Sequence, residues 1–122
     1  MSRANVVDSS GWLEYLAATK RASHFAKAIE DTENLYVPVV SIYEVFKKVF
    51  RERGEDDAFL VASMMQNGNV VELDVSLALE AAKLPLPLAD SIIYAAAIRH
   101  NATVWTQDED FENLPNVRYF PK

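Results

Sequence analysis

Short apolar segments with strand-like composition alternate with segments of helical pattern along the whole chain of 122 residues. The strand-like segments are residues 5–7 (NVV), 35–37 (LYV), 69–73 (NVVEL), 102–106 (ATVWT) and 117–120 (VRYF). Strands that alternate with helices in this way indicate a mostly parallel sheet sandwiched between helices. We therefore predict one α/β domain over residues 1–122, with a central sheet of about five short strands flanked by helices.

Helix boundaries follow from residues that start and stop helices. Ser9 or Ser10 is placed to cap a helix after the first strand. Pro38 opens a long amphipathic helix that Gly54 ends, and a later helix is predicted from about Leu88 to His100. The apolar face of the long helix is predicted to carry Val39, Ile42, Tyr43, Phe46, Val49 and Phe50.

Composition places the chain among globular proteins, because 50% of its residues are hydrophobic and 25% are charged. Its first residues lack the longer apolar region of a signal peptide, and no apolar stretch is long enough to span a membrane. The absence of cysteine argues against a disulfide scaffold and fits a reducing compartment. We expect a cytoplasmic protein without membrane contact.

The net charge is −6, whereas a protein that binds nucleic acid through a broad basic face usually carries a positive charge. The basic residues are nevertheless uneven, since Lys47, Lys48, Arg51 and Arg53 lie together. Bound cations would also neutralise clustered carboxylates. An acidic chain is equally suited to a basic protein partner, so the charge is compatible with either kind of partner.

Four acidic residues stand where an α/β fold exposes them: Asp8, Glu44, Asp90 and Asp108. Asp8 and Asp108 follow predicted strands, and ligands of open α/β sheets gather beyond the carboxyl ends of the strands. Asp90 falls in the first turn of a predicted helix. With no cysteine and only two histidines, the chain offers mainly carboxylate oxygens to a metal, and these select Mg²⁺ or Mn²⁺. Metal-assisted phosphodiester chemistry is the leading hypothesis.

Each of these acids also has an ordinary structural interpretation. Asp8, Asp90 and Asp108 could cap or open helices, which contributes roughly 0.5–2 kcal/mol. Glu44 could form an i,i+4 pair with Lys48 on the solvent side of its helix. Two other kinds of α/β protein fit the sequence less well. A phospho-accepting receiver domain needs an acidic pair after its first strand and a lysine late in the chain, but VVDSS has one acid and TVWTQDED has no lysine. A dehalogenase-type phosphatase needs an aspartate at the position of Ser10.

Four segments carry a resemblance to PIN-domain ribonucleases, and most of all to VapC-type toxins of toxin–antitoxin pairs. They are VVDSSGWLEYL, VVSIYEVFKK, LPLADSIIYAAAI and TVWTQDEDF, in this order. The similarity covers nearly the whole chain. It implies a PIN-like fold and a metal-dependent endoribonuclease in which Asp8, Glu44, Asp90 and Asp108 are catalytic. Thr106 matches the hydroxyl residue that accompanies the last motif.

The resemblance also implies roles and partners. Asp8, Asp90 and Asp108 would hold Mg²⁺ or Mn²⁺, directly or through water, while Glu44 would hold a metal-bound water or act as the base. Thr106 is also a substrate-binding candidate. Independently of the resemblance, Lys47, Lys48 and Arg51 could touch RNA phosphates because they lie on or beside the helix face of Glu44, although a run of charges on a helix is usually a solvated face. Similar toxins form homodimers and are silenced by a cognate antitoxin. The alternative is a catalytically silent PIN-like module that only binds a protein partner.

Overall fold

Five short parallel strands form the centre of the fold in the computed structural model, which describes residues 3–122. The strands are β1 (Asn5–Val7), β2 (Tyr36–Pro38), β3 (Asn69–Val71), β4 (Thr103–Thr106) and β5 (Val117–Tyr119). Strand β4 lies between β1 and β5, and β2 pairs with β3. A bridge between Asn5 and Leu35 joins the two groups. These pairings are all parallel, which confirms the predicted sheet.

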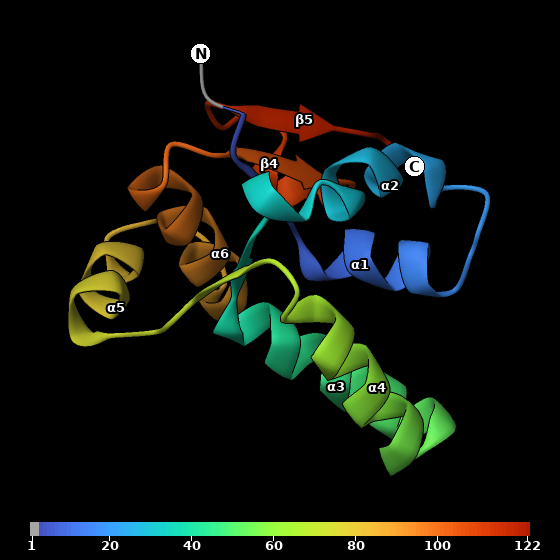
Figure 1. Ribbon diagram of the computed structural model, residues 1–122. Helices are drawn as coiled ribbons and strands as arrows, with labels where there is room; N and C mark the ends of the chain where they lie inside the picture. Colours follow the sequence, from blue (N-terminus) through green and yellow to red (C-terminus); the bar gives the residue numbers. More distant parts are fainter. Residues whose placement is uncertain (1–2) are drawn as a thin grey trace.

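Helices connect the strands and cover the sheet (Figure 1). They are α1 (Ser9–Leu16), α2 (Ser23–Glu30), α3 (Val39–Arg53), α4 (Glu55–Met65), α5 (Val75–Ala82) and α6 (Leu88–Arg99), with short 3₁₀ turns η1 (Thr32–Asn34) and η2 (Glu109–Phe111). None of the helices in residues 3–122 has the length and apolar character needed to cross a membrane.

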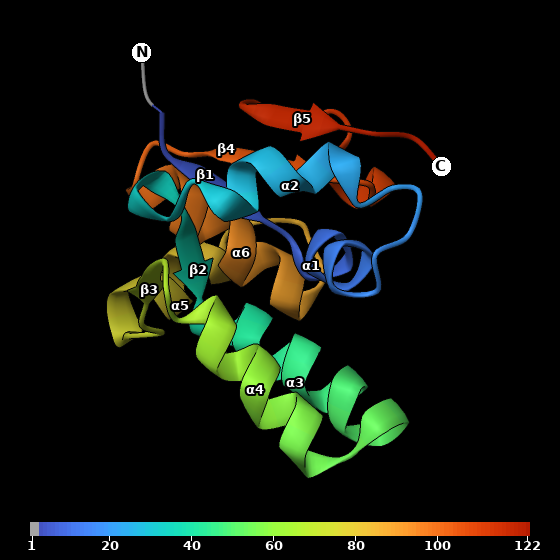
Figure 2. The same ribbon diagram turned by 45° about the vertical axis from the view of Figure 1, so that its right-hand side comes forward.

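The core has two sides because adjacent residues of a strand point to opposite faces of the sheet. Val7 of β1 packs with Trp12 of α1 and Phe25 of α2 in one cluster. Its neighbour Val6 packs in a second cluster with Ile93 of α6. Figure 2 shows α1 and α2 close to β1 and β4, with α6 behind them. The sheet is thus covered on both faces, as the short apolar strands require.

Helices α3 and α4 form a hairpin that extends away from the sheet (Figures 1 and 2). Gly54 joins them with φ 94°, a backbone conformation that glycine adopts without steric cost. The predicted end of the long helix at Gly54 is therefore confirmed. Phe46 holds the hairpin together through an edge-to-face contact with Phe59, whose ring centroid is 5.0 Å away.

One local prediction was wrong, and another was confirmed only in part. Asp8, and neither Ser9 nor Ser10, is the N-cap of α1, because its carboxylate accepts the Gly11 N–H. The buried line of α3 consists of Ser41, Val45 and Val49. Of the predicted apolar face, Val49 is buried and Ile42 and Phe46 pack against the core. Tyr43 and Phe50 are instead 60% and 47% exposed.

Candidate active site

The parallel pairing of β1 with β4 brings Asp8 next to Thr106. Val7 lies opposite Trp105, and the Asp8 N–H donates a hydrogen bond to the Trp105 carbonyl at 3.2 Å. Both strands end at the same edge of the sheet, where the β4–η2 turn then continues to Asp108. The sheet register thus places the first and last predicted acids beside each other, which the sequence alone could only suggest.

Asp8 is buried and held by several donors. Its carboxylate accepts hydrogen bonds from Thr106 Oγ1 at 2.6 Å, from the Gly11 N–H at 2.9 Å and from Ser10 Oγ at 3.0 Å. Burial nevertheless raises the pKa of Asp8, and these hydrogen bonds oppose the rise. Thr106 Oγ1 also accepts the Asp108 N–H at 2.9 Å, so one hydroxyl links two of the predicted acids.

Three carboxylates converge beside this pair. Asp90 in the first turn of α6 and Asp108 and Asp110 at η2 each offer an oxygen, and these oxygens lie within 4.8 Å of one another. Asp108 also caps η2 by accepting the Asp110 N–H at 2.9 Å. Asp110 is not among the acids predicted from the sequence, although the sequence shows the D-x-D spacing of residues 108–110.

The environment of Asp90 shows that the acids act on one another. Burial, and after it the negative charges of Asp108, Asp110, Asp8 and Glu44, together raise its pKa to about 7. Burial is the larger cause, and the named acids contribute because their negative charges disfavour ionisation of Asp90. A cation at this position would relieve that repulsion.

Glu44 reaches the same region from α3. Its carboxylate accepts a hydrogen bond from Ser9 Oγ at 2.6 Å, which ties α3 to the start of α1. The expected pair between Glu44 and Lys48 does not form in the described chain. Instead, Lys48 pairs with Glu52 at 3.0 Å. The ordinary explanation of Glu44 as half of a surface ion pair is therefore wrong.

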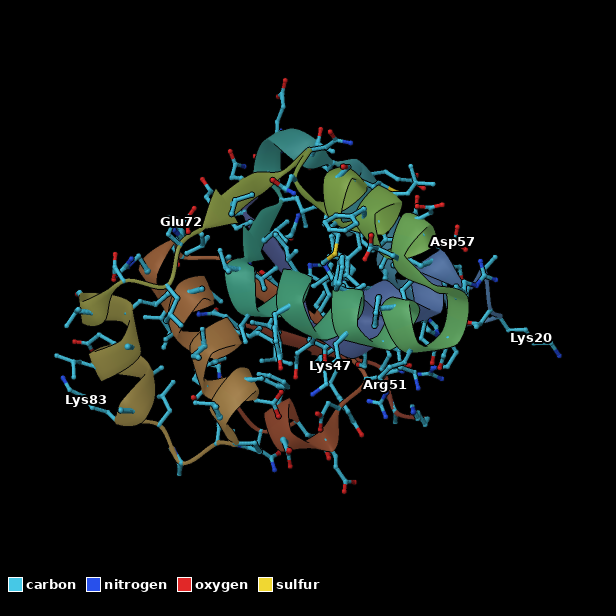
Figure 3. All side chains as sticks on the ribbon, turned by 90° about the horizontal axis from the view of Figure 1, so that it is seen from below. Lys20, Lys47, Arg51, Asp57, Glu72 and Lys83 are labelled. Atoms are coloured by element: carbon cyan, nitrogen blue, oxygen red, sulfur yellow. The ribbon has the colours of Figure 1, made fainter. Side chains whose placement is uncertain are left out.

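The basic residues of α3 divide into two groups. Lys48 is held by Glu52, whereas Lys47 lies over the Tyr43 ring, 5.7 Å from its centroid. Figure 3 shows Lys47 and Arg51 projecting from the same side of α3. Lys47 and Arg51 are exposed, so their side chains are accessible to a polyanion. Their role in substrate binding stays a prediction.

The donor set fits a hard divalent cation. Carboxylate oxygens of Asp90, Asp108 and Asp110 are within reach of one ion, and such oxygens are the usual ligands of Mg²⁺ and Mn²⁺ in proteins. The oxygens of Asp8 are occupied by neighbouring donors and lie outside this group of three. This geometry suits Asp8 to contact such an ion through a water molecule rather than directly.

The sequence model of the PIN domain family matches residues 6–117 of this chain. The chain belongs to the PIN domain family. No curated protein sequence matches it significantly.

Solved structures with the same fold share little sequence with this PIN domain. A toxin–antitoxin complex from Klebsiella pneumoniae has TM-score 0.77 at 19% identity, covering 98% of this chain and 100% of the other. VapC20 of Mycobacterium tuberculosis, described as a sarcin–ricin loop cleaving toxin, has TM-score 0.75 at 15% identity, with 93% and 97% covered. DNA-bound VapBC from Salmonella typhimurium has TM-score 0.73 at 14% identity, with 99% and 98% covered.

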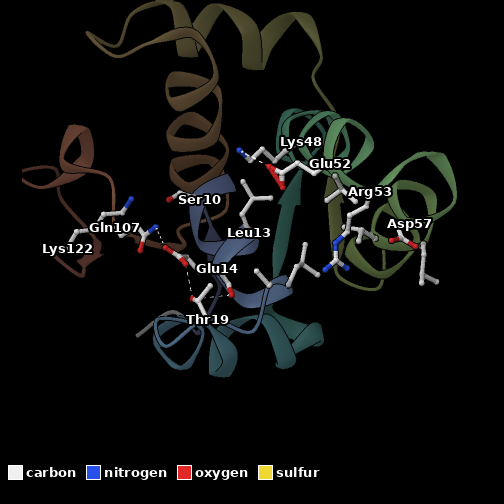
Figure 4. A pocket seen from close by; sticks show the side chains of 15 residues that line it. Ser10, Leu13, Glu14, Thr19, Lys48, Glu52, Arg53, Asp57, Gln107 and Lys122 are labelled. Atoms are coloured by element: carbon white, nitrogen blue, oxygen red, sulfur yellow. Dashed lines mark hydrogen bonds and ion pairs between the residues drawn. The ribbon is translucent and has the colours of Figure 1, made fainter.

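A groove of about 600 Å³ lies beside the acids of this PIN domain, between α1, α3 and α4 (Figure 4). Its apolar lining includes Leu13, Leu16, Val49, Leu60 and Val61. A smaller hollow of about 380 Å³ contains Asp108. Ser10 and Gln107 line both, so the groove reaches the edge of the acidic site.

Proposed function

We propose that this PIN domain is a metal-dependent endoribonuclease and the toxin of a VapC-type toxin–antitoxin pair. The observation that carries the proposal is the convergence of Asp90, Asp108 and Asp110 next to Asp8 and Glu44. Such a cluster destabilises a protein unless cations occupy it. The description of a similar structure as a toxin that cleaves the sarcin–ricin loop supports RNA as the substrate.

Each acid has a distinct role in this proposal. A bound Mg²⁺ or Mn²⁺ ion would lower the pKa of a water and offset charge on the phosphate. Asp90 and Asp108 would be direct ligands, Asp110 a third ligand, and Asp8 a ligand through water. Glu44, oriented by Ser9, would accept a proton from the attacking water.

Other residues would orient the site and the substrate. Thr106 holds the Asp8 carboxylate and the Asp108 backbone with one hydroxyl, which fixes their separation. Lys47 and Arg51, exposed on one side of α3, would contact RNA phosphates. Lys48 is paired with Glu52, so we expect a smaller contribution from it.

The groove between α1, α3 and α4 would receive an antitoxin. Its apolar lining suits an amphipathic segment, and a net charge of −6 favours a basic partner. Toxin–antitoxin complexes among the similar structures support this role. The same groove is the observation that favours the second candidate, a catalytically silent PIN-like module that binds a protein partner.

RNA cleavage by the purified chain tests the proposal. Wild type, Asp90→Asn and Asp56→Asn are compared with Mg²⁺, Mn²⁺ or EDTA, without any partner. Asp56 is a matched control because it also lies in the first turn of a helix, α4, but remote from the cluster. We expect wild type and Asp56→Asn to cut RNA only with metal, and Asp90→Asn to lose at least about 100-fold in rate.

Either of two results would contradict the proposal. If all three folded proteins are inert with every metal, the silent binding module becomes the better description. If Asp90→Asn cuts as fast as wild type, the acidic cluster is not the site of cleavage.

A further inference from the structure

A closed ring of hydrogen bonds lies next to the turn that carries Thr106 and Asp108. We call it the Gln107 ring, and its members are Glu14, Thr19, Arg21 and Gln107. The Gln107 side chain accepts a hydrogen bond from Arg21 Nε at 2.5 Å and donates one to Glu14 Oε2 at 2.7 Å. Thr19 Oγ1 donates to Glu14 Oε1 at 2.8 Å and accepts the Arg21 backbone N–H at 3.2 Å, which closes the ring.

The ring fixes Gln107 strongly because its amide is buried. Gln107 is only 6% exposed, and a buried amide is costly unless its oxygen and nitrogen both have partners. Arg21 adds a second anchor, since its guanidinium also donates to the Phe120 carbonyl at 2.7 Å. The ring therefore joins α1, the α1–α2 connection, the chain after β5 and the β4–η2 turn. Figure 4 shows Gln107 and Thr19 linked to the two sides of Glu14.

Gln107 stands in the chain between Thr106 and Asp108, which both belong to the acidic site. On one side of it, Thr106 Oγ1 donates to Asp8, and on the other the Asp108 N–H donates back to Thr106. The backbone of residues 106–108 is thus held by the site and by the Gln107 ring together. Without the ring, this turn loses its anchor to α1 and the α1–α2 connection. Asp108 would then be free to move relative to Asp90.

We propose that Gln107 is a positioning residue that, through the Gln107 ring, holds Asp108 in place for cation binding by the acidic cluster. This inference rests on the proposed function, because it assumes that the cluster binds a divalent cation. Loss of a group that hydrogen-bonds to a metal ligand and orients it typically lowers metal affinity or activity by about 10–100-fold. A loss of that order is expected here.

Mn²⁺ binding to the full chain without RNA tests the positioning role. Free Mn²⁺ is followed by electron paramagnetic resonance for wild type and Gln107→Met, which keeps the side-chain length but removes both hydrogen bonds. We expect a Kd for Mn²⁺ at least about 10-fold higher in the variant. Arg99→Met is the matched control, since it breaks the 3.2 Å ion pair of Arg99 with Asp74 on α5, and its Kd should equal that of wild type.

A double variant separates positioning from general weakening of the fold. Glu14→Gln combined with Gln107→Glu exchanges carboxylate and amide, so an acceptor for Arg21 and a donor between the two positions are both retained. We expect this exchange to restore Mn²⁺ affinity toward the wild-type value. If Gln107→Met does not fold, Glu14→Ala replaces it in the test. This variant removes the carboxylate that accepts the Gln107 hydrogen bond but leaves Gln107 in place, and it should also weaken Mn²⁺ binding.

The outcomes for the two proposals are distinct. Wild-type affinity in folded Gln107→Met, or no recovery in the folded exchange variant, would overturn the positioning role while the nuclease proposal stands. Wild-type affinity in Glu14→Ala would do the same if Gln107→Met is unfolded. No Mn²⁺ binding by wild type would overturn the proposed metal site itself, and with it the role of Gln107.

Discussion

At the scale of single residues, the pKa of Asp90 is shifted strongly by its surroundings. Burial and the neighbouring carboxylates raise its pKa from 3.8 to about 7 in the cation-free fold. Below pH 4 this carboxyl is protonated in both the folded and the unfolded chain. As the pH rises from about 4 to about 7, the unfolded chain releases the proton first, so Asp90 progressively lowers the free energy of unfolding.

Asp90→Asn should therefore stabilise the cation-free protein at neutral pH. In EDTA, we expect a higher melting temperature for the variant than for wild type at about pH 8, with the difference shrinking toward pH 4 because the raised pKa no longer matters there. Thermal unfolding across this pH range measures the effect. A difference that is absent, or that does not depend on pH, would mean that burial and the neighbouring acids do not raise the pKa of Asp90.

The sequence indicated the acids of the site but not how they are connected. Asp8, Asp90 and Asp108 could be proposed because each stands at the end of a predicted element. The double role of Thr106 could not, since it depends on the register of β1 against β4. Asp110 was missed because its place beside Asp90 and Asp108 depends on the conformation of the η2 turn, which local sequence does not determine.

At the scale of elements, α1 approaches the sheet and α2 closely at Gly11. A Cβ at this position would lie 2.7 Å from Phe25 Cδ1 and 2.7 Å from Val7 Cγ1. Both partners are core residues, so neither can move without disturbing the packing. Here glycine is needed for close approach between elements, and its backbone freedom is not the reason.

Gly11→Ala should destabilise the fold although alanine favours helices. Overpacking costs about 1–3 kcal/mol, and the gain in helix propensity is at most about 1 kcal/mol. We expect a net loss of about 1–2 kcal/mol in urea unfolding. Ser76→Ala, at an exposed position of α5, is the control and should be neutral or slightly stabilising. Stabilisation by Gly11→Ala would show that α1 can shift away from Phe25.

Element boundaries were predicted better than element faces. Gly54 stops α3 for a reason that is local, namely its positive φ. The buried side of α3 depends on where α1 and α4 pack against it. The spacing of apolar residues does not contain that information, so it predicted that Tyr43 is buried, whereas Tyr43 is exposed. The same reasoning explains the cap of α1, where the geometry of the β1–α1 turn selects Asp8 over the serines that follow it.

At the scale of the whole molecule, two of the regions that expose apolar side chains lie on different helices. One is the groove side of the α3–α4 hairpin, where Leu60 is 71% exposed. The other is α5, where Val75 and Leu79 are 76% and 62% exposed and lie one helical turn apart on the same face. Apolar residues grouped in this way are typical of surfaces that bind a protein. We expect the first to bind the proposed antitoxin and the second to bind a second copy of this chain.

The homodimer predicted from the resemblance would then use α5, whereas the groove would stay free. The purified chain should have twice its 13.7 kDa mass in sedimentation equilibrium. Leu79→Glu should reduce the mass to that of one chain, because an unpaired charge would be buried between the copies. Leu60→Glu is the matched control and should remain dimeric, since the groove takes a different partner. A dimer that survives Leu79→Glu but not Leu60→Glu would assign the groove to self-association, and the antitoxin would then have to bind elsewhere.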